Sequence, residues 1–348
     1  MAQGRFQQDF AVDLPLIQAP MAGVQDAALA LAVNQAGGLG SLPCAMLDLE
    51  TLVSELTHLK AHTCRPVNLN FFCHQVPAYD PHQQTQWRQR LQPYFDELGI
   101  TSNTLPTGAS RIPFDHQVAN AIEPFQPAII SFHFGLPEPS LLQRVKTWGT
   151  KILASATTVA EALWLESQGV DAIIAQGLEA GGHRGMFLST DLNTQMGLFA
   201  LLPQIVAQVQ VPVIAAGGIS DAQGVQAALT LGADAVQVGS AYLLCTEAKT
   251  SALHKAAIQS PRAHKTAITC IFSGKPARGI VNRAMQEIGT MPNQVPAFPY
   301  ASIEMGALRS QAETLGLDDF TPLWCGQNTS GCAPISATEL TLRLAGLA

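Results

Sequence analysis

The sequence predicts an α/β protein, and within that class a TIM (β/α)8 barrel with inserted lid or second-lobe segments. Short apolar runs alternate with stretches of helical period along most of the 348 residues. The runs are apolar on both faces, which is typical of a parallel sheet covered by helices. Gly, Ser and polar residues collect where the runs end, and this is the edge at which a barrel or an open doubly wound sheet binds its ligand.

The expected elements follow one another in order. Apolar runs indicate strands, and capping patterns and Gly pairs mark the ends of the helices between them. Capping boxes are expected at Thr158–Glu161 and Ser220–Gln223. Seven or eight strand-like runs over roughly 245 residues fit a closed barrel. The expected strands are 16–19, 67–71, 128–132, 151–156, 170–175, 211–216 and 233–238, and the expected helices are 27–36, 158–168, 198–209, 220–231 and a last one within 333–348.

Two stretches interrupt this alternation. Residues 75–112 are polar and rich in Gln, and residues 246–316 contain the sequence GKPARGIVN and a Pro-rich piece. We expect a single ligand-binding barrel built from 1–74, 113–245 and 317–348. The two interrupting stretches are expected to form an inserted lid or substrate lobe.

Composition excludes several classes of protein. Only 13% of the residues are charged and 47% are hydrophobic, which excludes a disordered chain. The net charge is −7 without any run of Lys or Arg, so nucleic acid is not an expected partner. No apolar stretch approaches the roughly 20 residues that span a bilayer. The polar N-terminus and seven Cys without a CxxC pair predict a cytoplasmic protein with free thiols.

Two Gly-rich strand ends predict a phosphate site. They are the sequences AAGGIS at 215–220 and QVGS at 237–240. Gly lacks a Cβ, so backbone N–H groups can approach an anion closely, and barrels use the loops after strands 7 and 8 for this purpose. A single Gly pair would be read as a tight turn, but two on consecutive units favour phosphate. A GxGxxG dinucleotide fingerprint is absent here.

Histidine and amide side chains at other strand ends are candidates for chemistry. His183 lies in a loop with four glycines after an expected strand, and His can exchange a proton near neutral pH. His133 also ends a strand, where it has either a pocket role or a structural one. Asn68 and Asn70 share a strand face, and Asn70 is expected to meet a ligand, although neighbouring backbone would also satisfy it. The remaining histidines are expected to have ordinary surface or core roles, and no spacing indicates a metal site.

Together these residues resemble the nitronate monooxygenase family, which comprises FMN-dependent barrels formerly called 2-nitropropane dioxygenases. The matching pieces occur in order across nearly the whole chain. They are PLIQAPMAGV (15–24), GGLGSL (37–42), NLNF (68–71), SFHFG (131–135), AQGLEAGGHRG (175–185), PVIAAGGIS (212–220), ADAVQVGSAYL (233–243) and GKPARGIVN (274–282).

The resemblance implies roles for individual residues. His183 would be the catalytic base, and His133 and Tyr300 would line the substrate pocket. Lys275 and Arg278 would shape its entrance. The family's late W-x-G-Q element is present at 324–327, followed by Asn328 where a Gly is expected. The residues implied to bind FMN are Pro20, Met21, Ala22, Gly23, Asn70, Gln176, Gly181, Gly182, Gly217, Gly218, Gln237, Val238, Gly239, Ser240 and Gln327.

The implied reaction is oxidation of an alkyl nitronate by O2 to a carbonyl compound and nitrite, which would detoxify nitronates such as propionate 3-nitronate. Neutral nitroalkanes are substrates of some family members. His183 would act as a base on the neutral substrate, and when protonated it would help bind the anion. Two alternatives stay open: an NAD(P)H-dependent FMN reductase of the same fold acting on a quinone or enoyl thioester, and a non-catalytic barrel that binds a phosphate ligand.

Overall fold

The computed structural model describes residues 4–101 and 111–348, and its centre is an eight-stranded parallel sheet. The sheet runs in the order β1-β9-β8-β6-β5-β4-β3-β2. A parallel bridge between Ile17 and Leu39 joins its two edges, and Leu39 N–H donates to Leu16 O over 2.8 Å. The predicted (β/α)8 barrel is therefore confirmed. The strands are β1 (Leu16–Gln18), β2 (Ser41–Pro43), β3 (Asn68–Phe72), β4 (Ile129–His133), β5 (Lys151–Ala156), β6 (Ala172–Gln176), β8 (Val213–Ala216) and β9 (Ala235–Val238).

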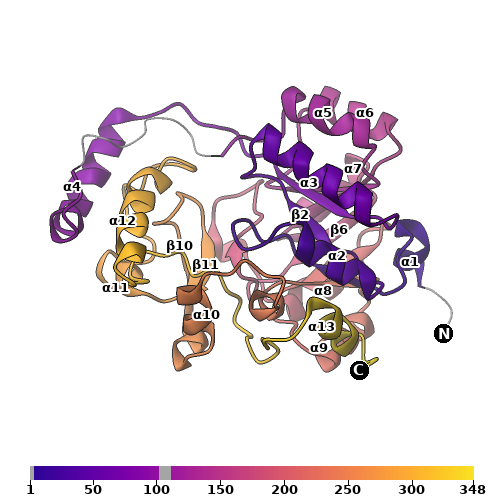
Figure 1. Cartoon of the computed structure of the whole chain (residues 1–348). Coiled ribbons are helices and arrows are strands. Elements are labelled where there is room, and N and C mark those ends of the chain that lie inside the picture. Colours follow the sequence, from indigo (N-terminus) through magenta and orange to yellow (C-terminus); the bar gives the residue numbers. More distant parts are fainter. Residues whose placement is uncertain (1–3, 102–110) are drawn as a thin grey trace.

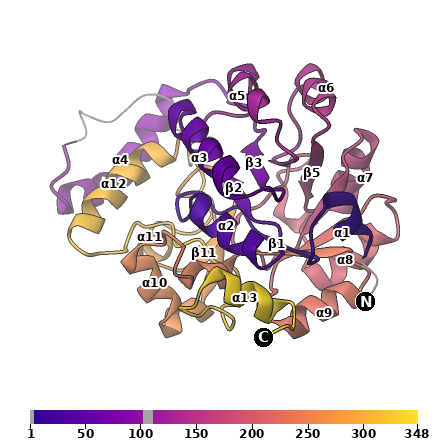
Figure 2. The same cartoon turned by 45° about the vertical axis from the view of Figure 1, so that its right-hand side comes forward.

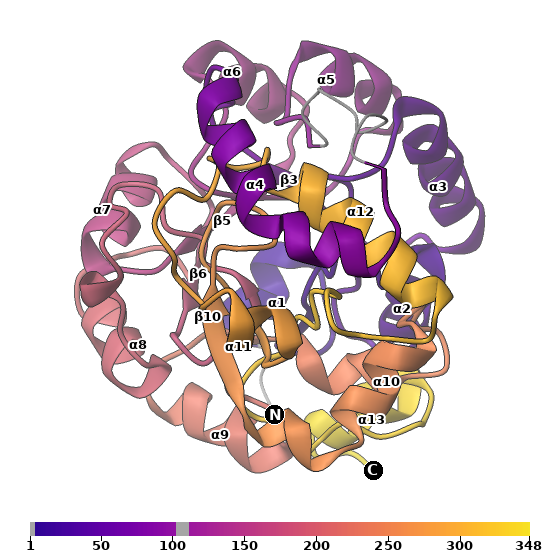
Figure 3. The same cartoon turned by 90° about the vertical axis from the view of Figure 1, so that its left-hand side faces the viewer.

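Helices surround the barrel on its outer face (Figure 3). Most of the outer apolar core lies between these helices and the outward side chains of the strands. No helix of the described residues is both long and apolar enough to cross a membrane. The surrounding helices are α2 (Ala27–Gln35), α3 (Leu49–His62), α5 (His116–Ile122), α6 (Pro139–Thr147), α7 (Val159–Ser167), α8 (Leu198–Val206), α9 (Ala222–Thr230) and α13 (Ala337–Leu344), with 3-10 turns at Glu123–Phe125, Leu192–Thr194 and Ser240–Leu244.

The N-terminal helix α1 (Arg5–Phe10) lies at one end of the barrel, on the side away from residues 81–97 and 302–314 (Figure 1). Phe6 and Phe10 stack with their ring centroids 4.6 Å apart. Both rings belong to the apolar cluster inside the barrel, together with strand residues such as Leu153 and Ile214. This helix was not predicted from the sequence, because only two apolar residues in a polar segment carry its packing.

A second group of elements lies over the other end of the barrel. Helices α4 and α12 pack along each other (Figures 2 and 3). Their shared apolar cluster includes Trp87, Phe95, Leu308 and Phe320. Phe320 packs in this cluster, although it lies in the segment 317–348 that was assigned to the barrel. The boundary expected at 316/317 stays a prediction. The elements of this group are α4 (Pro81–Glu97), α10 (Ala252–Ile258), a 3-10 turn (Pro261–His264), β10 (Thr266–Thr269), β11 (Ala277–Ile280), α11 (Arg283–Glu287) and α12 (Ser302–Thr314).

Local signals placed seven of the eight barrel strands and the helices α2, α7, α8, α9 and α13 to within a few residues. The helices α3, α5 and α6 were not predicted. The strand β2 was not predicted, since three residues between Gly40 and a loop give no periodicity. The helix α9 is capped by Asp221, whose carboxylate accepts from Gly224 N–H over 2.7 Å, so the capping box expected to start at Ser220 is wrong. Thr158 caps α7 as predicted, but the Glu161 carboxylate accepts from Thr157 N–H rather than completing a box.

Candidate active site

A pocket lies at the carboxyl ends of the barrel strands, beneath the second group of elements. Most of the site residues predicted from the sequence line it, although they come from segments up to 220 residues apart in the chain. The predicted residues that line the pocket are Pro20, Met21, Ala22, Gly23, Asn70, His133, Gln176, Gly181, Gly182, His183, Gly217, Gly218, Gln237, Gly239 and Ser240.

Five predicted residues lie outside the lining. Two of them, Lys275 and Arg278, were expected at the pocket entrance, and Arg278 instead donates its Nε–H to Leu178 O over 3.0 Å. Val238 is 1% exposed and packs in the outer barrel core. The Gln327 side chain is exposed, although Gly326 lines the pocket. Tyr300 donates its hydroxyl to Pro77 O over 3.0 Å and thereby joins the two inserted segments.

Glycines form one wall of the pocket. Gly217 and Gly218 have φ values of 121° and 72°, a region that residues with side chains rarely adopt. Within the described residues, no hydrogen bond takes up the backbone N–H of Gly217, Gly218 or Ser240. Asn328 donates its side-chain amide to Gly218 O over 2.9 Å and is not among the residues with positive φ. The Asn at this position therefore supports the glycine wall without a strained backbone.

The segment that carries Trp324 packs directly on this wall. Gly326 N–H donates to Ser240 Oγ over 2.8 Å. A Cβ added to Gly181 would lie 2.5 Å from the Cys325 carbonyl carbon, so the two backbones touch. The close approach of these backbones requires Gly at position 181 and aligns three pocket segments.

His183 lies on the short strand β7 (Gly182–His183), which pairs with β11 in a three-stranded antiparallel sheet, so that His183 is opposite Ala277. Its ring Nε2 lies 2.8 Å from Ser273 Oγ. Within the described residues Nδ1 has no hydrogen-bond partner, and it is not among the buried unpaired atoms. Since His183 lines the pocket, Nδ1 is the ring nitrogen that a ligand can reach.

Two side chains from the barrel strands β4 and β6 contact the backbone of His183. Its carbonyl oxygen accepts from Gln176 Nε2 over 2.9 Å and faces His133 Nε2 at 3.2 Å. Gln176 Oε1 accepts from Gly185 N–H over 2.7 Å, and His133 Nδ1 lies 3.0 Å from Ser155 Oγ. Gln176 and His133 therefore fix the loop that carries His183.

The histidines of this site are electrically neutral at pH 7. Burial, with smaller contributions from Arg111, His133, Lys275 and His74, holds the pKa of His183 well below its ordinary value. Burial likewise lowers the pKa of His133 to about 4. An imidazole with such a pKa is unprotonated at neutral pH, so it offers one N–H and one lone pair to a ligand.

An aromatic cluster surrounds the His183 ring. The ring centroids of Phe298 and Trp324 lie 5.6 and 5.5 Å from that of His183. Lys275 Nζ stands 4.7 Å from the centroid of Phe134, another member of this cluster. These apolar rings explain the desolvation of His183, and the ammonium group makes the region attractive to anions.

Several residues of the site were missed by the sequence analysis. Ser273 precedes the GKPARGIVN motif and carries no signal of its own. His254 was assigned an ordinary role, but it lines the pocket and is 4% exposed. Arg111 and Arg309 also line the pocket, and neither belongs to a motif.

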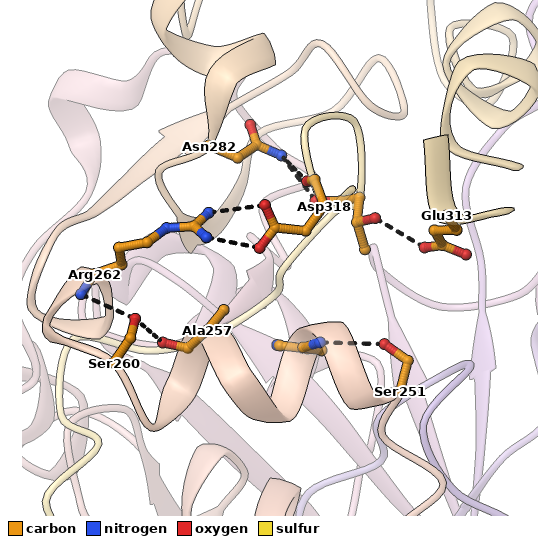
Figure 4. Close-up of polar contacts among 9 residues, drawn as sticks. Ser251, Ala257, Ser260, Arg262, Asn282, Glu313 and Asp318 are labelled. Carbon is orange, nitrogen blue, oxygen red and sulfur yellow. Dashed lines mark hydrogen bonds and ion pairs between the residues drawn. The ribbon is translucent and has the colours of Figure 1, made fainter. Parts of the chain in front are cut away.

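The wall near His254 is braced by polar contacts (Figure 4). Arg262 pairs with both carboxylate oxygens of Asp318, at 2.8 and 3.2 Å. Asn282 donates to Asp318 O, and Thr321 donates to Glu313 over 2.8 Å. These bonds tie the segment before Trp324 to the 3-10 turn that follows α10, to the start of α11 and to α12. In the part of the chain that the structure describes, no group of side chains could hold a metal ion.

The fold and the pocket together define an α/β-barrel enzyme that binds its ligands at the carboxyl ends of the strands. A family model described as nitronate monooxygenase matches residues 5–345. A nitronate monooxygenase of Pseudomonas aeruginosa is 37% identical over 97% of this chain and 96% of its own length. One of Paraburkholderia phytofirmans is 38% identical over 96% of this chain and 92% of its own. The chain therefore belongs to the nitronate monooxygenase family.

Solved structures agree with this assignment. A nitroalkane oxidase from Streptomyces ansochromogenes superposes with a TM-score of 0.86 at 34% identity, covering 96% of this chain and 95% of that one. FabK from Thermotoga maritima shares the fold, with a TM-score of 0.74 at 23% identity over 99% of this chain and 96% of that one. The protein is a flavin-dependent oxidoreductase of nitronates or nitroalkanes.

Proposed function

We propose that this enzyme uses FMN and O2 to oxidise alkyl nitronates to carbonyl compounds and nitrite, and that it thereby removes toxic nitronates. The single observation that carries the proposal is a half-buried His183 that lines a pocket with a glycine wall, with Nε2 held by Ser273 and Nδ1 left for a ligand. We also propose a cytoplasmic location, which the free thiols of all seven cysteines support.

The residues present fit FMN. The N–H groups of Gly217, Gly218 and Ser240 are three unpaired donors, which suit a terminal phosphate. Gln237 Oε1 is buried without a partner beside the pocket, and a flavin ring N–H is the kind of group that it lacks. Bound FMN would supply the redox chemistry of the reaction.

The chain's own contribution is binding, orientation and proton handling. Arg111 and Lys275 give the pocket a positive field that attracts an anionic substrate. With a neutral nitroalkane, His183 Nδ1 would take the proton from the carbon next to the nitro group. The second group of elements would act as the substrate lobe.

The test uses purified holoenzyme. We expect released flavin to be FMN, and we expect oxygen uptake and nitrite formation with propyl-2-nitronate. If NADH or NADPH rapidly bleaches the flavin without oxygen and a nitronate has no effect on it, the enzyme is instead an NAD(P)H-dependent FMN reductase. Protein that carries no flavin after purification and reconstitution would indicate a binding barrel.

A further inference from the structure

Ser273 is the partner of the His183 ring, and its position is set by the fold. It is 1% exposed and lies in the turn between β10 and β11. Gly274 N–H donates to Cys270 O over 2.8 Å, and Gly274 has a φ of 91°. A Cβ at Gly274 would overlap Pro296 O, so the turn requires Gly there. The pairing of β11 with β7 then brings Ser273 to His183.

Three groups surround the Ser273 hydroxyl. His183 Nε2 lies at 2.8 Å, and the carbonyl oxygen and the N–H of Lys275 both lie at 3.4 Å. The hydroxyl has one proton and can both donate and accept. If it donates to the Lys275 carbonyl, its oxygen accepts a hydrogen bond from Nε2–H, and Nδ1 carries no proton. If it donates to Nε2, its oxygen accepts a hydrogen bond from Lys275 N–H, and Nδ1 carries the ring proton.

We propose that Ser273 is a positioning residue that lets His183 switch between its two neutral tautomers, so that one imidazole serves both a nitroalkane and a nitronate. This inference rests on the proposed function. A bare Nδ1 accepts a proton from a nitroalkane carbon, and Nδ1–H donates a hydrogen bond to a nitronate oxygen. The two roles then need opposite tautomers but no change in the charge of the resting ring.

The proton step is balanced. The carbon–hydrogen bond of the nitroalkane breaks and an Nδ1–H bond forms, while the electron pair moves onto the nitro group to give the nitronate. The imidazolium donates Nδ1–H to the new anion and Nε2–H to Ser273. Release of one proton to solvent restores a neutral ring. The charged groups around this ring are Arg111 and Lys275, and the other titratable groups are His74 and His133.

Nitrogen-15 NMR of the holoenzyme tests the switch without turnover. The His183 signals are assigned by their loss in His183→Asn, and nitrate serves as an unreactive planar oxyanion. We expect saturating nitrate to move Nδ1 toward the shift of a protonated nitrogen and Nε2 toward that of a bare one. Unchanged shifts, or protonation of both nitrogens, would overturn the proposal. Because nitrate is not turned over, this result stands whether or not the enzyme oxidises nitronates.

Kinetics of Ser273→Ala provide the second readout. An unpaired buried N–H is less favourable than an unpaired lone pair, so the variant should favour Nδ1–H. We expect kcat/KM for a nitroalkane to fall roughly tenfold more than kcat/KM for its nitronate. Ser273→Thr, which keeps the hydroxyl, should restore the ratio. Thr269→Val removes a buried hydroxyl bond to Thr290 O in the same segment and is the matched control. Equal losses on both substrates in Ser273→Ala would assign Ser273 a merely structural role.

Discussion

Replacing Gln176 by Leu tests whether this residue acts by holding the His183 loop. The Gln176 side chain is 8% exposed and makes two bonds to the loop, donating to His183 O and accepting from Gly185 N–H. Leu has a similar volume and leaves little cavity. The substitution therefore removes two hydrogen bonds without removing much packing.

The magnitude follows from what each partner retains. Gly185 N–H becomes a buried donor with no acceptor, which costs about 1–3 kcal/mol. His183 O keeps its contact with His133 at 3.2 Å, so only the net worth of one bond, about 1 kcal/mol, is lost there. Together we expect a loss of about 2–4 kcal/mol, and hence a roughly thirty- to thousandfold rise in the population of the open loop.

Hydrogen exchange at the Gly185 amide measures this opening directly, with denaturant unfolding of the holoenzyme beside it. Saturating flavin must be present throughout, because a bound ligand stabilises the folded state. Gln84→Leu is the matched control, since Gln84 is a buried Gln of the second group that bonds to Tyr300 O and Glu304. Unchanged Gly185 exchange in Gln176→Leu, with less than about 0.5 kcal/mol lost, would refute the reasoning.

Three further predictions concern the same pocket. His183→Asn should reduce oxygen uptake with a neutral nitroalkane at least about a hundredfold, and with the preformed nitronate less; equal losses would count against a base role. Gly181→Ala forces a Cβ to within 2.5 Å of the Cys325 backbone. We expect this variant to lose about 1–3 kcal/mol of stability and to retain less flavin. Gly306→Ala is the control, because its Cβ meets no atom within 4 Å and should not destabilise the protein. Burial lowers the pKa of His133 from its ordinary value of 6.5 to about 4. Its neutral form thus contributes stability above pH 6.5 that is lost toward pH 4, by about 1.4 kcal/mol per pH unit, and denaturant titrations of wild type and His133→Gln should diverge over that range.

The barrel was predictable because its signals are local. Each strand is a short apolar run, and Gly or polar residues follow it at the pocket edge, as with Gly217 and Gly218 after β8. Because the carboxyl ends of parallel strands meet at one edge, residues far apart in sequence could be assigned to one pocket. The helix α1 was not predicted, because its two Phe residues pack inside the barrel against distant strands, and no local pattern indicates that packing.

The supporting contacts of the site depend on long-range pairing. Ser273 meets His183 only because β11 pairs with β7, 90 residues away. The motif that contains Gln327 could be found in the sequence, but the direction of its side chain could not, and the structure places that side chain at the surface while its neighbours line the pocket. A motif thus locates a loop, whereas tertiary pairing decides which of its atoms face the ligand.

The charge state of His183 in a complex follows from the order of causes that set its pKa. Burial is the largest cause, and the cations Arg111 and Lys275 are smaller ones. An anionic nitronate would offset the cations but would not restore water to the ring, so His183 should stay neutral when the anion binds. Binding would then depend on a neutral N–H donor and fixed cations rather than on an imidazolium. We therefore expect KM for a nitronate to be flat with pH through the ordinary titration range of histidine. A KM that rises with pH through that range would show instead that a protonated His183 binds the anion.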